Sequence, residues 1–216
     1  MRRSKEAKQQ THARIVEAAA RRFRADGIAG VAITDLMGEA GLTHGGFYAH
    51  FDNKDALVSE ACGAGLAQSR GRMLESVRKA PAERRVAAFV ARYLTIAHRD
   101  HPEAGCMMPT LSAEVARSAP AVRAAYTQAI KDYRDELASL LTAADGSDGS
   151  AESGDAVASD EASDQALVLL AGLAGTMLLA RAIDDPDLSE RMLRVNREFY
   201  GRVFTGHSVA DALAPS

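Results

Sequence analysis

Apolar residues recur along this chain at helical spacing. Ile15, Ala19 and Phe23 are each four residues apart, which places them on one face of a helix. The strict alternation of apolar and polar residues that a half-buried strand requires is almost absent from the chain. We therefore predict an all-α fold of about nine helices.

Polar N-caps and glycine stops set the expected boundaries of the first four helices. These helices are predicted at about residues 11–26, 34–40, 43–50 and 54–78, with Thr11, Thr34, Thr43 and Asn53 as their N-caps and Gly27 and Gly41 as the stops after the first two. The second and third helices are short and are joined by the turn Gly41-Leu42-Thr43. This arrangement is typical of a helix-turn-helix.

Prolines and a polar segment divide the rest of the chain. Pro81 suits the first position of a fifth helix, which His101-Pro102 would end. Residues 144–163 consist of Gly, Ser, Ala, Val and acidic residues with almost nothing to bury, which indicates a flexible acidic linker. The remaining helices are expected near 111–117, after Pro120, and at about 164–183 and 188–204.

These elements predict two domains. Residues 1–10 would form a basic N-terminal arm, residues 11–58 a three-helix DNA-binding domain with the helix-turn-helix, and residues 59–206 a C-terminal helical bundle that binds a ligand and dimerises, followed by a tail at 207–216.

Charge is segregated along the chain, although the net charge is only −3. Residues 1–24 hold eight basic and two acidic side chains, whereas residues 144–164 hold seven acids and no base. The basic end suits contact with phosphate. The alternative is that this N-terminal segment is a solvated tail that does not contact DNA.

The cysteine count, the N-terminal sequence and the longest apolar run indicate the cellular compartment and whether the protein associates with a membrane. Two cysteines make no disulfide framework, and the polar N-terminus lacks a signal sequence. The most apolar run, residues 166–180, is shorter than the roughly 18–20 residues of a membrane span, so we expect a buried helix, a cytoplasmic protein and no membrane partner.

The stretch GLTHGGFYAHFDNK at residues 41–54 carries the predicted chemistry. In a helix-turn-helix the second helix enters the major groove, and backbone approaches DNA closely only where no Cβ stands in the way. Gly45 and Gly46 remove two such atoms at the front of that helix, and the Thr43 hydroxyl lies beside its free N–H groups. Tyr48 and His50 would face outward, while Phe47 and Phe51 would face the core.

The run from residue 13 to residue 57 resembles the DNA-binding domain of the TetR family of bacterial transcriptional regulators. The resemblance rests on Gly27, the Thr that begins the second helix, AG-x-T at the turn, G-x-x-Y-x-H-F and a Lys three residues later. It implies an all-helical homodimer whose partners are a double-stranded DNA operator, a second copy and an unknown, largely apolar small-molecule effector. It also implies repression that the effector relieves, with no cofactor.

Six positions match those at which such regulators contact DNA: Thr34, Thr43, Gly45, Tyr48, His50 and Lys54. His44 and Gly46 complete the predicted DNA-binding set. The chain departs from the family pattern at His44, where Lys is common, and at Ala49, where a bulky residue is common. Both departures leave the operator sequence open.

The C-terminal half offers candidates that each have a plainer interpretation. A ligand cavity would be lined by Tyr93, Met107, Met108, Tyr126, Tyr133 and Met177, although side chains at this spacing are more often core. Cys106 is a candidate redox sensor or an inert buried thiol. Gly172, Gly175 and Phe199 are candidates for a dimer seam, although the glycines also suit packing within one subunit.

Functions of other classes remain as alternatives. A protein that binds DNA without sequence preference or ligand response would suit the basic N-terminus. A helical-bundle enzyme is the weaker alternative, because no catalytic set, metal-ligand set or phosphate-binding loop has credible spacing. We therefore predict a regulator that is not an enzyme.

Overall fold

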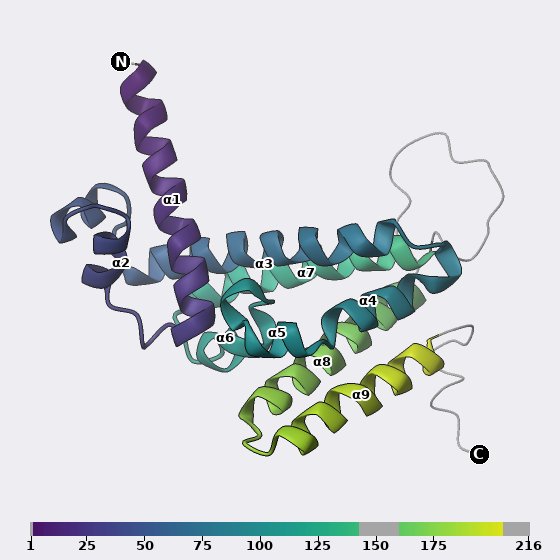
Figure 1. Ribbon diagram of the computed structural model, residues 1–216. Helices are drawn as coiled ribbons and strands as arrows, with labels where there is room; N and C mark the ends of the chain where they lie inside the picture. The colour runs from purple at the N-terminus through teal and green to yellow at the C-terminus, as the bar shows by residue number, and fades with distance from the viewer. Residues whose placement is uncertain (1, 143–159, 205–216) are drawn as a thin grey trace, which may run out of the picture. The chain divides into compact units, whose positions relative to one another are not determined.

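The computed structural model describes residues 2–142 and 160–204, and in these ranges it is helical without strands. Its α-helices are α1 Arg2–Asp26, α2 Ile33–Glu39, α3 Lys54–Arg78, α4 Arg85–Tyr93, α5 Ile96–Asp100, α6 Met108–Val115, α7 Pro120–Thr142, α8 Asp160–Ala182 and α9 Pro186–Val203 (Figure 1). Three 3₁₀ helices accompany them: η1 His44–Ala49, η2 Ala82–Arg84 and η3 Pro102–Ala104. The predicted all-α fold of about nine helices is confirmed.

The chain forms two compact units. The first comprises residues 1–69 and 101–130, and the second comprises residues 70–100 and 131–216. Helices α3 and α7 each contribute to both units. The segment with η3 and α6 therefore packs with the N-terminal helices, whereas the domain boundary expected near residue 58 would have separated them.

The core of the N-terminal helices forms from the apolar faces that the spacing predicted. Ile15, Phe23 and Phe47 have no exposed surface, and Leu36 and Met37 of α2 pack with them at 1% or less. Fully burying each of these large side chains contributes roughly 1.5–3 kcal/mol. This packing fixes α2 and η1 against α1 and leaves the opposite face of η1 to solvent.

Helix α1 begins earlier than predicted. It starts at Arg2, so residues 2–10 belong to the helix and do not form a separate arm. The Thr11 hydroxyl donates to the Ala7 carbonyl oxygen at 2.9 Å inside the helix, and Thr11 is therefore not an N-cap. The segment is rich in Arg, Lys and Gln, which are good helix formers, and α1 extends through it.

The two short elements of the helix-turn-helix differ in detail from the prediction. Ala32, not Thr34, occupies the N-cap position of α2, and Thr34 lies inside the helix. Thr43 does occupy the N-cap position of the next element, but its side chain makes no capping hydrogen bond. That element, η1, is a 3₁₀ helix, a tighter form that short helices commonly adopt.

The glycine stops and the cap of α3 are confirmed. Gly27 and Gly41 have φ values of 76° and 71°. This left-handed backbone conformation is unfavourable for residues that carry a Cβ and is common for glycine at the end of a helix. The Asn53 carboxamide oxygen accepts from the Ala56 amide at 2.9 Å, and α3 runs from Lys54 to Arg78 as predicted.

The middle of the chain is more broken than predicted. Pro81 precedes the 3₁₀ helix η2 and not an α-helix, and the expected single helix up to His101 is divided into η2, α4 and α5. Helix α6 begins at Met108, three residues before the predicted start. Tertiary packing can override the helix propensity of the local sequence, so the limits of such short elements are not predictable from that propensity alone.

The two C-terminal helices pack along each other in the second unit (Figure 1). Helix α8 begins at Asp160, so the last part of the predicted linker at 144–163 is helical, because acidic residues favour the first turn of a helix. The rest of the linker and the tail at 207–216 lie outside the described residues. The Asp185 carboxylate accepts from the Leu188 amide at 3.1 Å and caps α9.

Helix α8 is longer than its apolar run suggested. It has 23 residues and a window of mean hydropathy 1.6, which meets the length and composition of a membrane span. Only 39% of that window is buried within the chain. The helix as a whole is thus longer than its apolar run, but a single helix of this kind is weak evidence for a membrane span, because a packed helix in a protein core meets the same length and composition.

Candidate nucleic-acid interface

The face of η1 that points away from the core carries the predicted contact residues. Tyr48 is 62% exposed, and Thr43, His44 and Gly45 are also exposed. Phe47 and Phe51 are buried at 0% and 3%, and their rings lie 5.4 Å apart. Tyr48 thus faces outward and Phe47 and Phe51 inward as predicted, whereas His50, which was also expected to face outward, is partly buried.

Gly45 has no role in the protein's own packing. A Cβ at this position would meet no atom within 4 Å. A Cβ at Gly46 would lie 3.7 Å from the Thr43 hydroxyl oxygen, an ordinary contact. Neither glycine has the left-handed conformation of Gly27 and Gly41. The protein's own packing therefore gives no reason for glycine at the start of η1. Close approach of this backbone to DNA would give one.

Thr34 in α2 and His44 in η1 are both exposed, and each makes a side-chain contact. The Thr34 hydroxyl is 3.4 Å from the Asp35 carboxylate, and the His44 ring packs edge-on to Tyr48 at 5.9 Å. Both side chains are exposed. They remain predicted DNA contacts.

His50 lies at the C-terminal end of η1 in a partly buried position next to α1. Its ring is 5.7 Å from that of His12, which hydrogen-bonds the Glu60 carboxylate at 2.6 Å. Burial, followed by the charges of His12 and Lys8, lowers the pKa of His50. The lowered pKa favours the neutral ring in the free protein. The sequence had not singled out His12, because it lies 38 residues earlier.

Lys54 has a structural role that the sequence did not predict. Its ammonium donates to the carbonyl oxygens of Ile28 and Val31, both at 2.7 Å. Two of its three N–H groups are thereby used within the chain. Lys54 thus fixes the connection between α1 and α2, and its contact with phosphate stays a prediction that rests on the third N–H group.

The six predicted ligand-lining residues are divided between the two units. Tyr93, Tyr133 and Met177 belong to the second unit and have no exposed surface. Met107, Met108 and Tyr126 belong to the first. Burial raises the pKa of Tyr126 to about 12, and its hydroxyl lies 2.7 Å from that of Ser112. Five of the six side chains are buried and Tyr126 is half-buried, and packing in the protein core explains this without a ligand.

Both cysteines are fully buried. Burial, aided by the negative charge of Glu114, raises the pKa of the Cys62 thiol to about 12, so this thiol is unreactive near neutral pH. Cys106 has no exposed surface either, which agrees with the interpretation as an inert thiol. Its role as a redox sensor stays a prediction.

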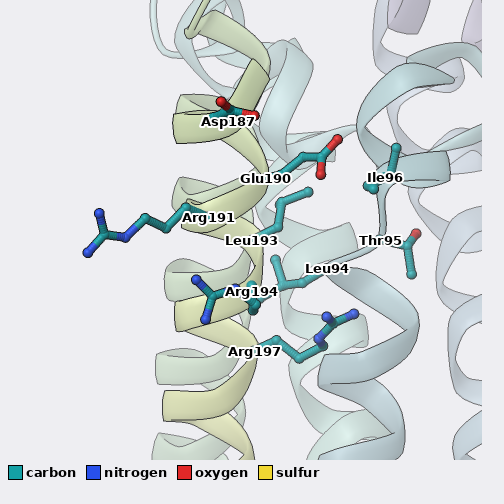
Figure 2. A pocket seen from close by; sticks show the side chains of 9 residues that line it. All are labelled: Leu94, Thr95, Ile96, Asp187, Glu190, Arg191, Leu193, Arg194 and Arg197. Carbon is teal, nitrogen blue, oxygen red and sulfur yellow. The ribbon is translucent and has the colours of Figure 1, made fainter. Parts of the chain in front are cut away.

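A groove of about 420 Å³ lies in the second unit, between α9 and the junction of α4 with α5. Figure 2 shows Glu190 and Leu193 pointing into it, whereas Arg191 points away. Buried Leu94 and Leu193 contribute apolar surface, and the other lining residues are Thr95, Ile96, Asp187, Glu190, Arg191, Arg194 and Arg197. None of the six predicted ligand-lining residues lines this groove.

The predicted dimer residues differ in their surroundings. A Cβ at Gly172 would lie 1.8 Å from the Tyr200 hydroxyl oxygen of the same chain, so Gly172 serves packing within one subunit. At Gly175 a Cβ would meet nothing within 4 Å, and Phe199 is 51% exposed. Only these last two present open surface.

A short helix, a left-handed glycine turn and a second element with an exposed, side-chain-poor front together define a helix-turn-helix protein. The family model of the bacterial regulatory proteins of the tetR family matches residues 15–61, and the model of the tetracyclin repressor-like C-terminal domain matches residues 82–195. The chain belongs to the TetR family.

Individual relatives agree with this assignment. The HTH-type transcriptional regulator TtgR of Pseudomonas putida is 47% identical over 58 residues, which is 27% of this chain and 28% of that protein. The probable HTH-type transcriptional regulator ArpR, also of Pseudomonas putida, matches over the same extent. The match thus spans little more than a quarter of these relatives' length.

Solved structures share the fold over most of the chain. A TetR regulator from Chloroflexus aurantiacus J-10-FL has a TM-score of 0.72 at 23% identity and covers 94% of this chain and 98% of its own. The reduced form of E. coli NemR has a TM-score of 0.70 at 20% identity, with 88% and 95% covered. Bacillus subtilis FadR in complex with stearoyl-CoA has a TM-score of 0.61 at 18% identity, with 90% and 98% covered.

Proposed function

We propose that this protein is a sequence-specific DNA-binding transcriptional regulator, a homodimeric repressor that a small molecule releases from a pseudo-palindromic operator. The observation that carries the proposal is the exposed front of η1, where Tyr48 projects beside a glycine that the fold itself does not need. In this arrangement η1 enters the major groove and α2 lies across it. The protein would act in the cytoplasm, where its DNA is.

Replacement of Gly45 by alanine tests this proposal because it separates binding from folding. The new Cβ meets nothing in the free protein, so the free energy of unfolding should stay the same or rise by up to ~1 kcal/mol. Affinity for operator DNA should fall about tenfold or more, because the methyl group would stand between η1 and the duplex. Fluorescence anisotropy at a fixed ~150 mM salt measures the affinity, since salt alone changes it strongly.

Gly71→Ala is the matched control. Gly71 lies on α3, is exposed and also has open space for a Cβ. This variant should bind DNA like the parent. Equal affinities of the Gly45→Ala variant and the parent would show that the front of η1 does not approach DNA closely.

The exposed apolar faces of α8 and α9 support the proposed homodimer. Their side chains are between 38% and 54% exposed and recur at helical spacing: Leu167, Val168, Leu178 and Leu179 on α8, and Leu188, Val195 and Phe199 on α9. Seven large apolar side chains exposed on two neighbouring helices suit an interface better than contact with water. A second copy that contributes the same two helices would cover them with two-fold symmetry.

The effector is proposed to be a largely apolar small molecule. It would prefer the conformation in which the two reading heads, α2 and η1 of each subunit, are too far apart or too close for the two half-sites of the operator. In the second unit, its proposed lining is Tyr93, Tyr133 and Met177, which have no exposed surface. A relative of similar fold holds stearoyl-CoA, so fatty acyl thioesters are a first class to screen for release of bound DNA. A differential affinity of ~2.7 kcal/mol between the two conformations is enough for a 100-fold release.

A further inference from the structure

The connection between α1 and α2, residues 27–32, is held by charged side chains from two distant helices. The Glu114 carboxylate of α6 accepts from the Ile28 amide at 3.1 Å and from the Ala29 amide at 2.9 Å. On the other side, Lys54 of α3 donates to the carbonyl oxygen of the same Ile28 at 2.7 Å. Both polar groups of the Ile28 backbone are therefore fixed by side chains remote in sequence.

The residue before Ile28 is shaped for the carboxylate. Gly27 ends α1 in the left-handed conformation at φ 76°. A Cβ there would also lie 2.6 Å from Oε1 of Glu114, closer than a real contact permits. Gly27 thus serves two purposes: it allows the turn, and it leaves room for the carboxylate to reach both amides.

A second hydrogen bond ties the end of α1 to η3, which precedes α6. Arg24 lies in the last turn of α1 and is only 3% exposed. Its Nε donates to the Glu103 carbonyl oxygen of η3 at 2.7 Å. Helix α6 lies at this end of α1 (Figure 1). The end of α1 and the connection after it are therefore hydrogen-bonded to two elements, to η3 through the Glu103 carbonyl oxygen and to the last turn of α6 through Glu114.

We propose that Glu114 is a positioning residue for DNA binding: it couples α6 to the reading head by holding the α1–α2 connection. Helix α6 lies in the part of the chain matched by the C-terminal family model, whereas the connection lies in the part matched by the N-terminal model. A displacement of α6 moves the carboxylate, and with it the backbone from which α2 and η1 start. The inference rests on the proposed DNA-binding function, and it assigns the contact through which the two parts communicate.

DNA itself is a suitable ligand for testing this coupling, because coupling between two sites is reciprocal. If α6 controls the head, DNA bound at the head changes α6. Hydrogen exchange of the full-length protein reports both ends: the amides of residues 28 and 29, and those of 108–115. The probe is a duplex that carries the site selected from a random pool.

Glu114→Gln is the decisive variant. In the carboxylate each oxygen accepts from one amide, whereas a carboxamide places an NH2 donor where one of these oxygens was, so one amide N–H would face another donor. Exchange at residues 28 and 29 should become about tenfold faster in the DNA-free variant, and operator affinity should fall about tenfold. The protection that DNA confers on 108–115 in the parent should be lost in the variant.

Glu103→Gln is the matched control. It removes a negative charge from the neighbouring segment, but its side chain pairs with His101. The link from Arg24 uses the Glu103 backbone oxygen, which the substitution leaves in place. This variant should keep the parent's exchange and affinity. If circular dichroism shows that Glu114→Gln does not fold, Glu114→Asp, whose shorter side chain keeps the charge but reaches fewer amides, replaces it with the same expectations.

The outcomes are distinguishable. Parent-like affinity and parent-like DNA-induced protection of 108–115 in the Glu114→Gln variant would overturn the coupling. A parent that binds no selected duplex would overturn the proposed function, and the coupling would fall with it. In that case the exchange at residues 28 and 29 would still show whether the hydrogen bonds exist.

Discussion

Replacing Leu178 with aspartate is expected to convert the proposed dimer into monomers and to lower operator affinity roughly 100-fold or more. Leu178 lies in the exposed apolar face of α8 and is 47% exposed in the single chain. A second copy packed on this face would bury the side chain, and an unpaired carboxylate there would cost several kcal/mol. A monomer engages one half-site and loses the gain of binding two at once.

Ile96→Asp provides the control for this variant. Ile96 is also 47% exposed, but it lies on α5 and not on the proposed interface. Sedimentation equilibrium should give a dimer for the parent and for Ile96→Asp, and a monomer for Leu178→Asp. A dimeric Leu178→Asp protein would show that another surface joins the subunits.

Acid is expected to destabilise the protein through His98, by about 3 kcal/mol between pH 6.5 and pH 4. His98 is 7% exposed, and its Nδ1 lies 2.7 Å from the Tyr93 carbonyl oxygen. Burial, with the nearby charges of Arg181 and Arg92, lowers the pKa of His98 from 6.5 to about 4, although the hydrogen bond to Tyr93 opposes the shift. The neutral ring donates to that carbonyl.

The sign follows from proton binding. Between these two pKa values the unfolded chain binds a proton at His98 and the folded chain does not. The stability that His98 contributes is therefore complete above pH 6.5 and is lost as the pH falls toward 4. The figure of about 3 kcal/mol is this shift at ~1.4 kcal/mol per pKa unit.

Urea unfolding at a fixed protein concentration across this pH range measures the effect, because dimer stability depends on concentration. The His98→Gln variant should lose stability more slowly with falling pH than the parent does. The His101→Gln variant should follow the parent, because the His101 side chain is 66% exposed. If His98→Gln and the parent lose stability equally, another group is responsible.

Local chemistry predicted part of this fold accurately. The Asn53 cap and the extent of α3 from Lys54 to Arg78 follow from signals within a few residues, and so do the left-handed glycines Gly27 and Gly41. Periodicity also placed Phe47 in the core and Tyr48 on the surface. Each of these features is decided by neighbours in sequence.

Features decided by distant contacts were not predictable in this way. Lys54 resembles a phosphate contact in sequence, yet it binds backbone of the α1–α2 connection 23 and 26 residues away. Glu114 contacts residues 85 and 86 positions earlier, and nothing in its local sequence indicates this. Likewise, Gly172 suits a dimer seam by pattern, but Tyr200 of the same chain occupies the space beside it.

Selection of bound sequences from a pool of random duplex DNA, with the purified full-length protein, tests the central claim most directly. The account predicts enrichment of a pseudo-palindromic motif whose half-site centres lie about one DNA turn (~34–36 Å) or slightly more apart, because a two-fold dimer presents two η1 elements. Enrichment of no sequence, with binding that only follows the salt concentration, would contradict it and identify a non-specific DNA-binding protein.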